Sequence, residues 1–246
     1  MSLYLIRLIS PLAEYLLIGL FSNALFPGGG LYASLMEKSL CLLLMERLYR
    51  RDNQIITWEP VRKDRLFFPA AAFIGFSACL FINCFFEVTG LNGALAADAA
   101  ASTVLYHQSL PLEILLFLFL APLSEEFLFR GIFYRRLRTL CRPVPAVLTG
   151  ALVFALFHGN LLQGLYAFLL GILLLYVYET SHSLLAPIVL HTAANLASLV
   201  MTEVPALHRF CADYTVLILA VSGVCTAAGL ALVMRNQKKT RLYLDK

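Results

Sequence analysis

The stretch PLEILLFLFLAPLSEEFLFRGIFY, residues 111–134, sets the character of the chain. It is longer than the roughly 20 residues that an α-helix needs to cross a bilayer core of about 30 Å. Apart from Ser124, its polar residues are all ionisable: Glu113, Glu125, Glu126 and Arg130. We therefore interpret it as a membrane-spanning helix that carries charged side chains into an apolar setting.

The whole chain has the composition of a membrane protein. Of its 246 residues, 60% are hydrophobic and only 14% are charged, against roughly 25% charged residues in an ordinary soluble domain. So few charged side chains cannot cover the surface of a soluble protein of this length. A soluble domain, a disordered chain and a coiled coil are thus excluded, and continuous rather than alternating apolar segments argue against a transmembrane β-barrel.

The apolar runs predict an all-α, polytopic transmembrane helical bundle of about eight helices. We expect one membrane-embedded domain over residues 1–246, with its catalytic core in helices of the segment 110–201. The predicted spans are 3–26, 31–46, 66–88, 111–134, 144–158, 161–178, 184–201 and 214–234. The loop 88–110 contains no Lys or Arg, so the positive-inside rule puts both termini in the cytoplasm. The compact chain favours a bacterial plasma membrane.

The basic residues and the cysteines indicate few further binding partners. The basic loops are explained as orientation signals and contacts with lipid headgroups of the bilayer, so we expect no nucleic acid to bind. The six cysteines form no CxxC pair, which indicates neither a disulfide framework nor a zinc cluster. The oligomeric state stays open.

The fifth predicted span is unusually short. Residues 144–158 form about 22 Å of helix, which is too short to cross the hydrocarbon core. We therefore expect the joint His158-Gly159-Asn160 to lie below the membrane surface. Irregular backbone at that depth is tolerated where protein or water surrounds it, so the joint predicts a hydrated cavity.

The motif SEEFLFRG, residues 124–131, contains two adjacent glutamates with different neighbours. Glu126 and Arg130 have the i,i+4 spacing, acid first, of a helical ion pair. Glu125 has no partner in sequence, so we expect it to be left free and to act as a general base. Glu125 can lie deep enough in the membrane to approach His158 only if the fourth helix continues to about Leu140.

Other ionisable residues in the spans have milder explanations. Glu37 and Lys38 are adjacent opposite charges in the second span. Glu113 lies near a helix start, where the helix dipole favours an acid. Glu14 in the first span stays open between helix packing and an accessory role.

Two further motifs contain histidines on separate apolar helices. In FALFH, residues 154–158, Phe154 and His158 are one helical turn apart. In HTAAN, residues 191–195, His191 and Asn195 have the same spacing, so two polar groups on one face could stabilise a developing oxyanion. Alone, each motif could equally be a packing contact or an interhelical hydrogen bond.

Taken together, EExxxR, FxxxH and HxxxN in this order resemble the CPBP family. This family comprises CAAX prenyl endopeptidases and bacteriocin-processing proteins, also called the abortive-infection family. The resemblance covers about residues 110–201 and implies an eight-helix intramembrane glutamic endopeptidase that needs no cofactor. By position, it implies that Glu125 and His158 activate water and that His191 and Asn195 stabilise the oxyanion. Glu126 and Arg130 would hold the site in shape, with Phe154 packed beside His158.

Two alternatives stay open beside this reading. Glu125, His158 and His191 could instead form a His2Glu zinc site of a metalloprotease, although no HExxH occurs. The chain could also be a non-enzymatic immunity or scaffold protein that binds a peptide in the same cavity. A membrane-associated peptide or protein is the expected substrate, and nothing in the chain selects a prenyl group.

Overall fold

The computed structural model describes residues 2–27, 30–58, 61, 63, 65–95 and 109–244. Within these ranges every regular element is a helix and no strand occurs, which confirms the all-α class. Most of the predicted loop 88–110 lies outside the described residues. Its described beginning contains one short helix, α4 (Leu91–Ala94).

The chain divides into two compact units. The first comprises residues 1–58 and 103–150, and the second comprises residues 59–102 and 151–246. The boundary at residues 150 and 151 falls inside α9 (Pro143–Leu156). The single domain over the whole chain stays a prediction.

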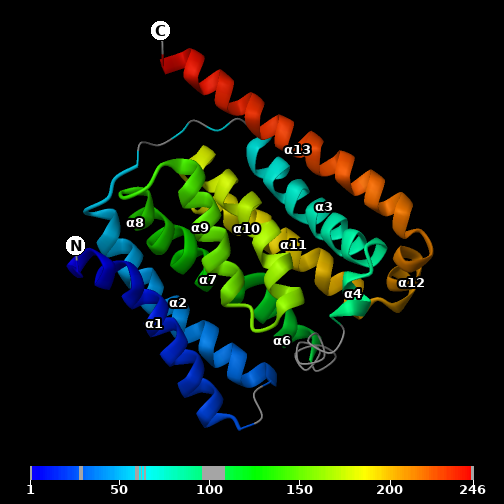
Figure 1. Cartoon of the computed structure of the whole chain (residues 1–246), viewed down its shortest axis with the longest axis horizontal. Helices are drawn as coiled ribbons and strands as arrows, with labels where there is room; N and C mark the ends of the chain where they lie inside the picture. Colours follow the sequence, from blue (N-terminus) through cyan, green and yellow to red (C-terminus); the bar gives the residue numbers. More distant parts are fainter. Residues whose placement is uncertain are drawn as a thin grey trace. The chain divides into compact units, whose positions relative to one another are not determined.

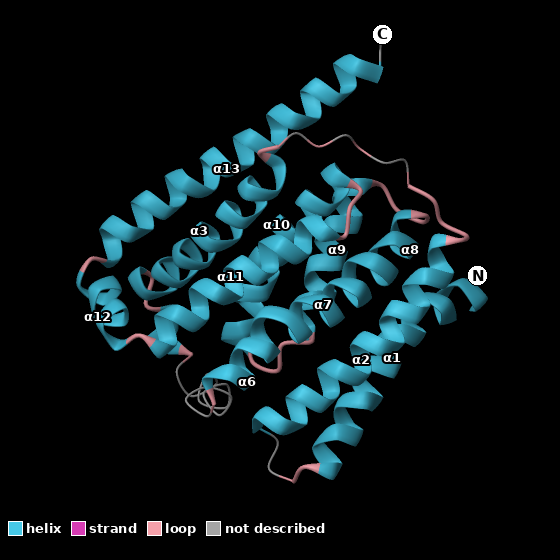
Figure 2. Ribbon diagram, turned by 180° about the vertical axis from the view of Figure 1, so that it is seen from behind, coloured by secondary structure: helices cyan, strands magenta, loops and turns pink. Residues whose placement is uncertain are grey.

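The first unit consists of two long helices and a third, irregular one. Helices α1 (Ser2–Leu25) and α2 (Gly30–Asn53) lie side by side (Figure 2). The third is one unbroken helical stretch that packs on both of them. Its parts are α6 (Leu110–Ile114), η2 (Leu115–Leu120), α7 (Ala121–Glu126), η3 (Phe127–Tyr134) and α8 (Arg135–Arg138). The expected continuation of this helix toward Leu140 is confirmed.

The irregularity of this third helix was not predicted. Segments η2 and η3 are π-helical, so their backbone hydrogen bonds join residues five apart instead of four. Such segments are rare and occur often at functional sites. Here they flank α7, which carries both glutamates of the SEEFLFRG motif.

The second unit is organised around α3 (Phe67–Val88). Helix α13 (Thr215–Leu244) runs along it (Figure 1), and α11 (Leu185–Glu203) packs on it as well. The remaining helices are α10 (Leu161–Ser181), which packs on α11, and α12 (Pro205–Asp213), a short helix where we expected only a loop.

Two glycines allow α3 to pack closely against α11 and α13. A Cβ placed on Gly75 of α3 would overlap the carbonyl oxygen of Leu190 and lie 2.8 Å from its carbonyl carbon. A Cβ on Gly229 of α13 would lie 2.5 Å from Cγ1 of Ile74. Small residues allow such close approach of helices, as is common in membrane proteins. Gly75 thereby sets the position of the backbone next to His191.

Within the part of the chain that the structure describes, five helices are long and apolar enough to cross a membrane. They are Tyr4–Leu25, Phe67–Val88, Leu161–Ser181, Leu185–Glu203 and Thr215–Arg235. Helix α9 is shorter, as predicted, and α2 extends beyond the predicted 31–46 into a charged end at Arg50 and Arg51. The polytopic helical class is confirmed, and the number of eight spans is approximate.

Candidate active site

The glutamates of the first unit lie on α7 and are both buried. Glu126 is fully enclosed, whereas Glu125 keeps 8% of its surface exposed. The adjacent Ser124 uses its hydroxyl to donate a hydrogen bond to the carbonyl of Ala121 at 3.2 Å. The two carboxylates thus occupy different surroundings despite being neighbours in sequence.

Glu126 forms the ion pair that the sequence predicted. Nη1 of Arg130 lies 3.0 Å from Oε1 of Glu126, and neither side chain has any exposed surface. A buried charge is tolerated only when another charge or hydrogen bonds compensate it. This pair therefore links the end of α7 to η3.

Glu125 is paired with a lysine from another helix. Nζ of Lys38 in α2 lies 2.9 Å from Oε1 of Glu125 and 3.4 Å from Oε1 of Glu37. The same ammonium group donates a hydrogen bond to the hydroxyl of Tyr15 in α1. The expectation that Glu125 has no partner was wrong, because the partner is distant in sequence. A lysine in an apolar helix was the available signal, since such a residue needs a compensating group.

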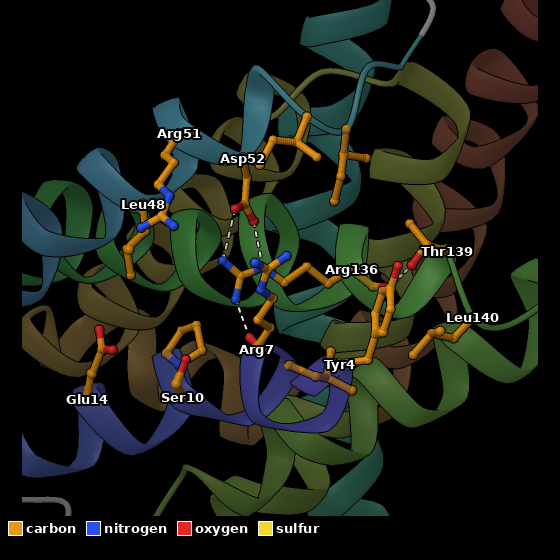
Figure 3. Close-up of a pocket in the computed structure, with 14 residues that line it drawn as sticks. Tyr4, Arg7, Ser10, Glu14, Leu48, Arg51, Asp52, Arg136, Thr139 and Leu140 are labelled. Atoms are coloured by element: carbon orange, nitrogen blue, oxygen red, sulfur yellow. Dashed lines mark hydrogen bonds and ion pairs between the residues drawn. The ribbon is translucent and has the colours of Figure 1, made fainter. Parts of the chain in front are cut away.

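A cavity of about 500 Å³ lies elsewhere in the first unit, between α1, the end of α2 and α8. Figure 3 shows the guanidinium of Arg136 reaching both oxygens of Asp52, at 2.6 and 2.9 Å, and the backbone carbonyl of Arg7. Glu14, which the sequence left unexplained, lines this cavity. Glu125 does not line it, so this hollow and the cluster around Lys38 are separate features.

In the second unit, the helix that carries FALFH stops early. Helix α9 ends at Leu156, and the amide of His158 donates to the carbonyl of Ala155 at 3.1 Å, which closes a tight last turn. Gly159 then adopts a left-handed φ of 70°, which glycine tolerates without strain. The side chain of Asn160 accepts a hydrogen bond from the amide of Gln163 at 2.8 Å and caps α10. The break predicted at His158-Gly159-Asn160 is confirmed, with His158 in the turn instead of on the helix. Its depth in the membrane and the hydrated cavity stay predictions.

Phe154 contacts both histidines of the second unit. Its ring centroid lies 4.5 Å from that of His158 and 6.0 Å from that of His191, edge to face in both cases. Nδ1 of His158 lies 2.8 Å from the carbonyl oxygen of Phe154. Since a carbonyl can only accept, Nδ1 must carry the proton, which makes Nε2 the acceptor in the neutral ring. The contact predicted between Phe154 and His158 is confirmed.

His191 and Asn195 lie one turn apart on α11. His191 is buried and Asn195 is half-buried. The i,i+4 spacing puts both side chains on one face of the helix, as predicted. Two groups that can donate hydrogen bonds are thus presented from a single rigid element.

The six predicted site residues fall into two sets. The first unit contains Glu125, Glu126 and Arg130, and the second contains His158, His191 and Asn195. The gathering of all six in one site stays a prediction. Within either unit, the described residues include no group of three His, Cys, Asp or Glu side chains placed to bind a metal ion.

The comparison with family models gives an independent result for this part of the chain. Residues 107–197 match the family described as type II CAAX prenyl endopeptidase Rce1-like. Searches of curated proteins and of solved structures returned no match. The matched segment contains all six predicted site residues, whereas Tyr15 and Lys38 lie outside it. Residues 107–197 are therefore similar to the Rce1-like family, in agreement with the resemblance to the CPBP family, and this similarity supports a CAAX-type intramembrane protease.

Proposed function

We propose that the protein is a glutamate-dependent endopeptidase that hydrolyses a peptide bond of a membrane-associated peptide or protein. The observation that carries this proposal is the unequal environment of the two adjacent glutamates. Glu126 is fully enclosed with Arg130, whereas Glu125 retains access and a charged neighbour. A general base must be ionised and reachable by water, and the ammonium group beside Glu125 and its remaining exposed surface support this role.

In the proposed reaction Glu125 takes a proton from a water molecule while the water oxygen attacks the scissile carbonyl carbon. The electron pair of the carbonyl π bond moves to its oxygen, and the resulting oxyanion accepts hydrogen bonds from His191 and Asn195. The C–N bond then breaks, and Glu125 returns its proton to the leaving amine. The products are a carboxylate end and an amine end.

His158 is proposed to orient the attacking water. The hydrogen bond from its Nδ1 to the carbonyl of Phe154 makes Nε2 an acceptor, which suits a water molecule that must point one hydrogen at His158 and the other at Glu125. Phe154 packs against both histidines and would fix their relative placement. The reaction requires that the two units bring Glu125 and His158 to the same water molecule.

Several features of the setting are part of the proposal. We place the enzyme in a membrane with both termini cytoplasmic, on the charge distribution of the loops. The roles of Glu126 and Arg130 are structural. No metal takes part in the proposed reaction.

Co-expression with candidate membrane-peptide precursors tests this proposal, with product ends identified by mass spectrometry. We expect cleavage by the wild type, also in the presence of chelator, and loss of at least about 100-fold with Glu125→Gln. Glu46→Gln is the matched control, because it removes a carboxylate from the partly exposed surface of α2. Full cleavage by Glu125→Gln would overturn the proposal, and loss of wild-type cleavage on chelation would favour the zinc alternative.

A further inference from the structure

Lys38 is the centre of a polar cluster in the first unit. It lies in the first half of α2, and its side chain is only 16% exposed. Three oxygen atoms surround its ammonium group, and they come from Tyr15, Glu37 and Glu125. An ammonium group has three N–H donors, so this number of acceptors matches its donors and fixes the side chain.

The geometry favours Glu125 over the nearer neighbour in sequence. Glu37 precedes Lys38 directly, and local neutralisation would need no more than that carboxylate. The ammonium nevertheless lies closer to Glu125, at 2.9 Å, than to Glu37, at 3.4 Å. Lys38 therefore reaches across a helix interface to one oxygen of the proposed general base.

Tyr15 holds the lysine from α1, because its hydroxyl accepts a hydrogen bond from the ammonium group. Its ring centroid lies 4.8 Å from Nζ of Lys38. The same ring packs edge to face on Phe129 of η3, with centroids 6.1 Å apart. Residues from α1, α2, α7 and η3 thus meet in one cluster, which limits the positions that the ammonium can take.

We propose that Lys38 is a positioning residue for Glu125, with Tyr15 as its support. This inference rests on the proposed function of Glu125. The ammonium group holds Oε1 of Glu125 at 2.9 Å and, as a neighbouring cation, favours the ionised carboxylate before water attack. Once Glu125 carries the proton, Glu37 remains as the counter-charge of Lys38. The lysine itself exchanges no proton and forms no bond with the substrate.

A labelling experiment tests the inference without any substrate. Hydrophobic carbodiimides modify protonated carboxyl groups, so an ionised Glu125 in the purified full-length protein should react slowly at neutral pH. Both neutral variants, Lys38→Gln and Lys38→Met, should raise labelling of Glu125 on the order of tenfold, whereas Lys38→Arg should stay near the wild type. Arg50→Gln is the matched control, because it removes an exposed cation from the same helix.

Kinetics on any peptide that the wild type cleaves provide the second readout. The neutral Lys38 variants should lower kcat on the order of tenfold or more with KM within about twofold, and Lys38→Arg should recover part of kcat. Unchanged labelling and unchanged kcat in folded neutral variants would overturn the inference. A fall in both melting temperature and kcat in the neutral variants, with neither restored in Lys38→Arg, would also overturn the inference, since that pattern indicates a role in packing alone.

The two proposals fail in different ways. If the wild type cleaves and Glu125→Gln does not, but the neutral Lys38 variants keep full kcat, only the role of Lys38 is wrong. If labelling responds to Lys38 as expected and Glu125→Gln still cleaves, Glu125 is an ion-paired residue without the proposed catalytic role.

Discussion

Glu125 and Glu126 should differ sharply in what loss of their charge does to stability. Glu126→Gln leaves Arg130 with its charge in a place where neither side chain of the pair has exposed surface. Removal of one partner from a buried ion pair costs about 3–5 kcal/mol. For a chain of this length, that corresponds to a fall in melting temperature on the order of 10 °C.

Glu125→Gln should cost much less. The side chains of Lys38 and Glu125 are 16% and 11% exposed, and Glu37 remains 3.4 Å from the ammonium group. The amide oxygen of the new Gln can still accept a hydrogen bond from Lys38. We therefore expect a loss of about 1.5 kcal/mol or less, together with the loss of cleavage.

Thermal unfolding of the purified full-length variants in detergent measures the difference. The double variant Glu126→Gln/Arg130→Gln removes both charges, so its loss should be smaller than the sum of the two single losses, by about 1–3 kcal/mol. Equal losses for Glu125→Gln and Glu126→Gln would refute the assignment of separate roles. A double variant whose loss equals the sum of the single losses would refute the pairing of Glu126 with Arg130.

Three further outcomes follow from the second unit. Gly75→Ala should lower the free energy of unfolding by about 1–3 kcal/mol, since its new methyl group meets the backbone of Leu190. The control Gly93→Ala places its methyl group in open space and should leave the melting temperature nearly unchanged. Equal effects of the two substitutions would contradict the close packing at Gly75. Asn160→Ala should cost about 1 kcal/mol by removing the cap of α10, and an unchanged melting temperature would contradict that role. Burial raises the pKa of the Cys211 thiol. Because the thiolate is the reactive form, the rate of Cys211 alkylation should be low at pH 8 and continue to rise at higher pH. An alkylation rate at pH 8 equal to that of the unfolded chain would contradict the raised pKa.

The parts of the candidate site that could be predicted from the sequence are local. The pair of Glu126 and Arg130 is fixed by i,i+4 spacing on one helix. The early end of α9 follows from the short apolar run and from Gly159, and the cap by Asn160 belongs to the same turn. Each of these features depends on residues within one or two helical turns.

The parts that were missed depend on packing between helices. Lys38 and Glu125 lie on different helices, and nothing in their spacing along the chain indicates contact. The adjacent Glu37 offered a sufficient local explanation, although the structure shows that Lys38 bonds to Glu125 as well. The π-helical segments beside α7 were also missed, because their Leu- and Phe-rich sequence is equally typical of an ordinary apolar helix.

The cluster around Lys38 also bears on how the chain enters the membrane. Helices α1 and α2 are synthesised before α7, so Lys38 is in place before Glu125 exists. A lysine at the centre of a membrane span opposes insertion by about 2.5–3.5 kcal/mol, and Lys38 lies near the centre of the predicted span 31–46. Glu37 and Tyr15 are already present in this first hairpin and can compensate the charge while the ribosome completes the rest. The proposed general base thus reaches a cation whose charge its neighbours already compensate, and α7 supplies the last counter-charge to a helix that precedes it in the chain.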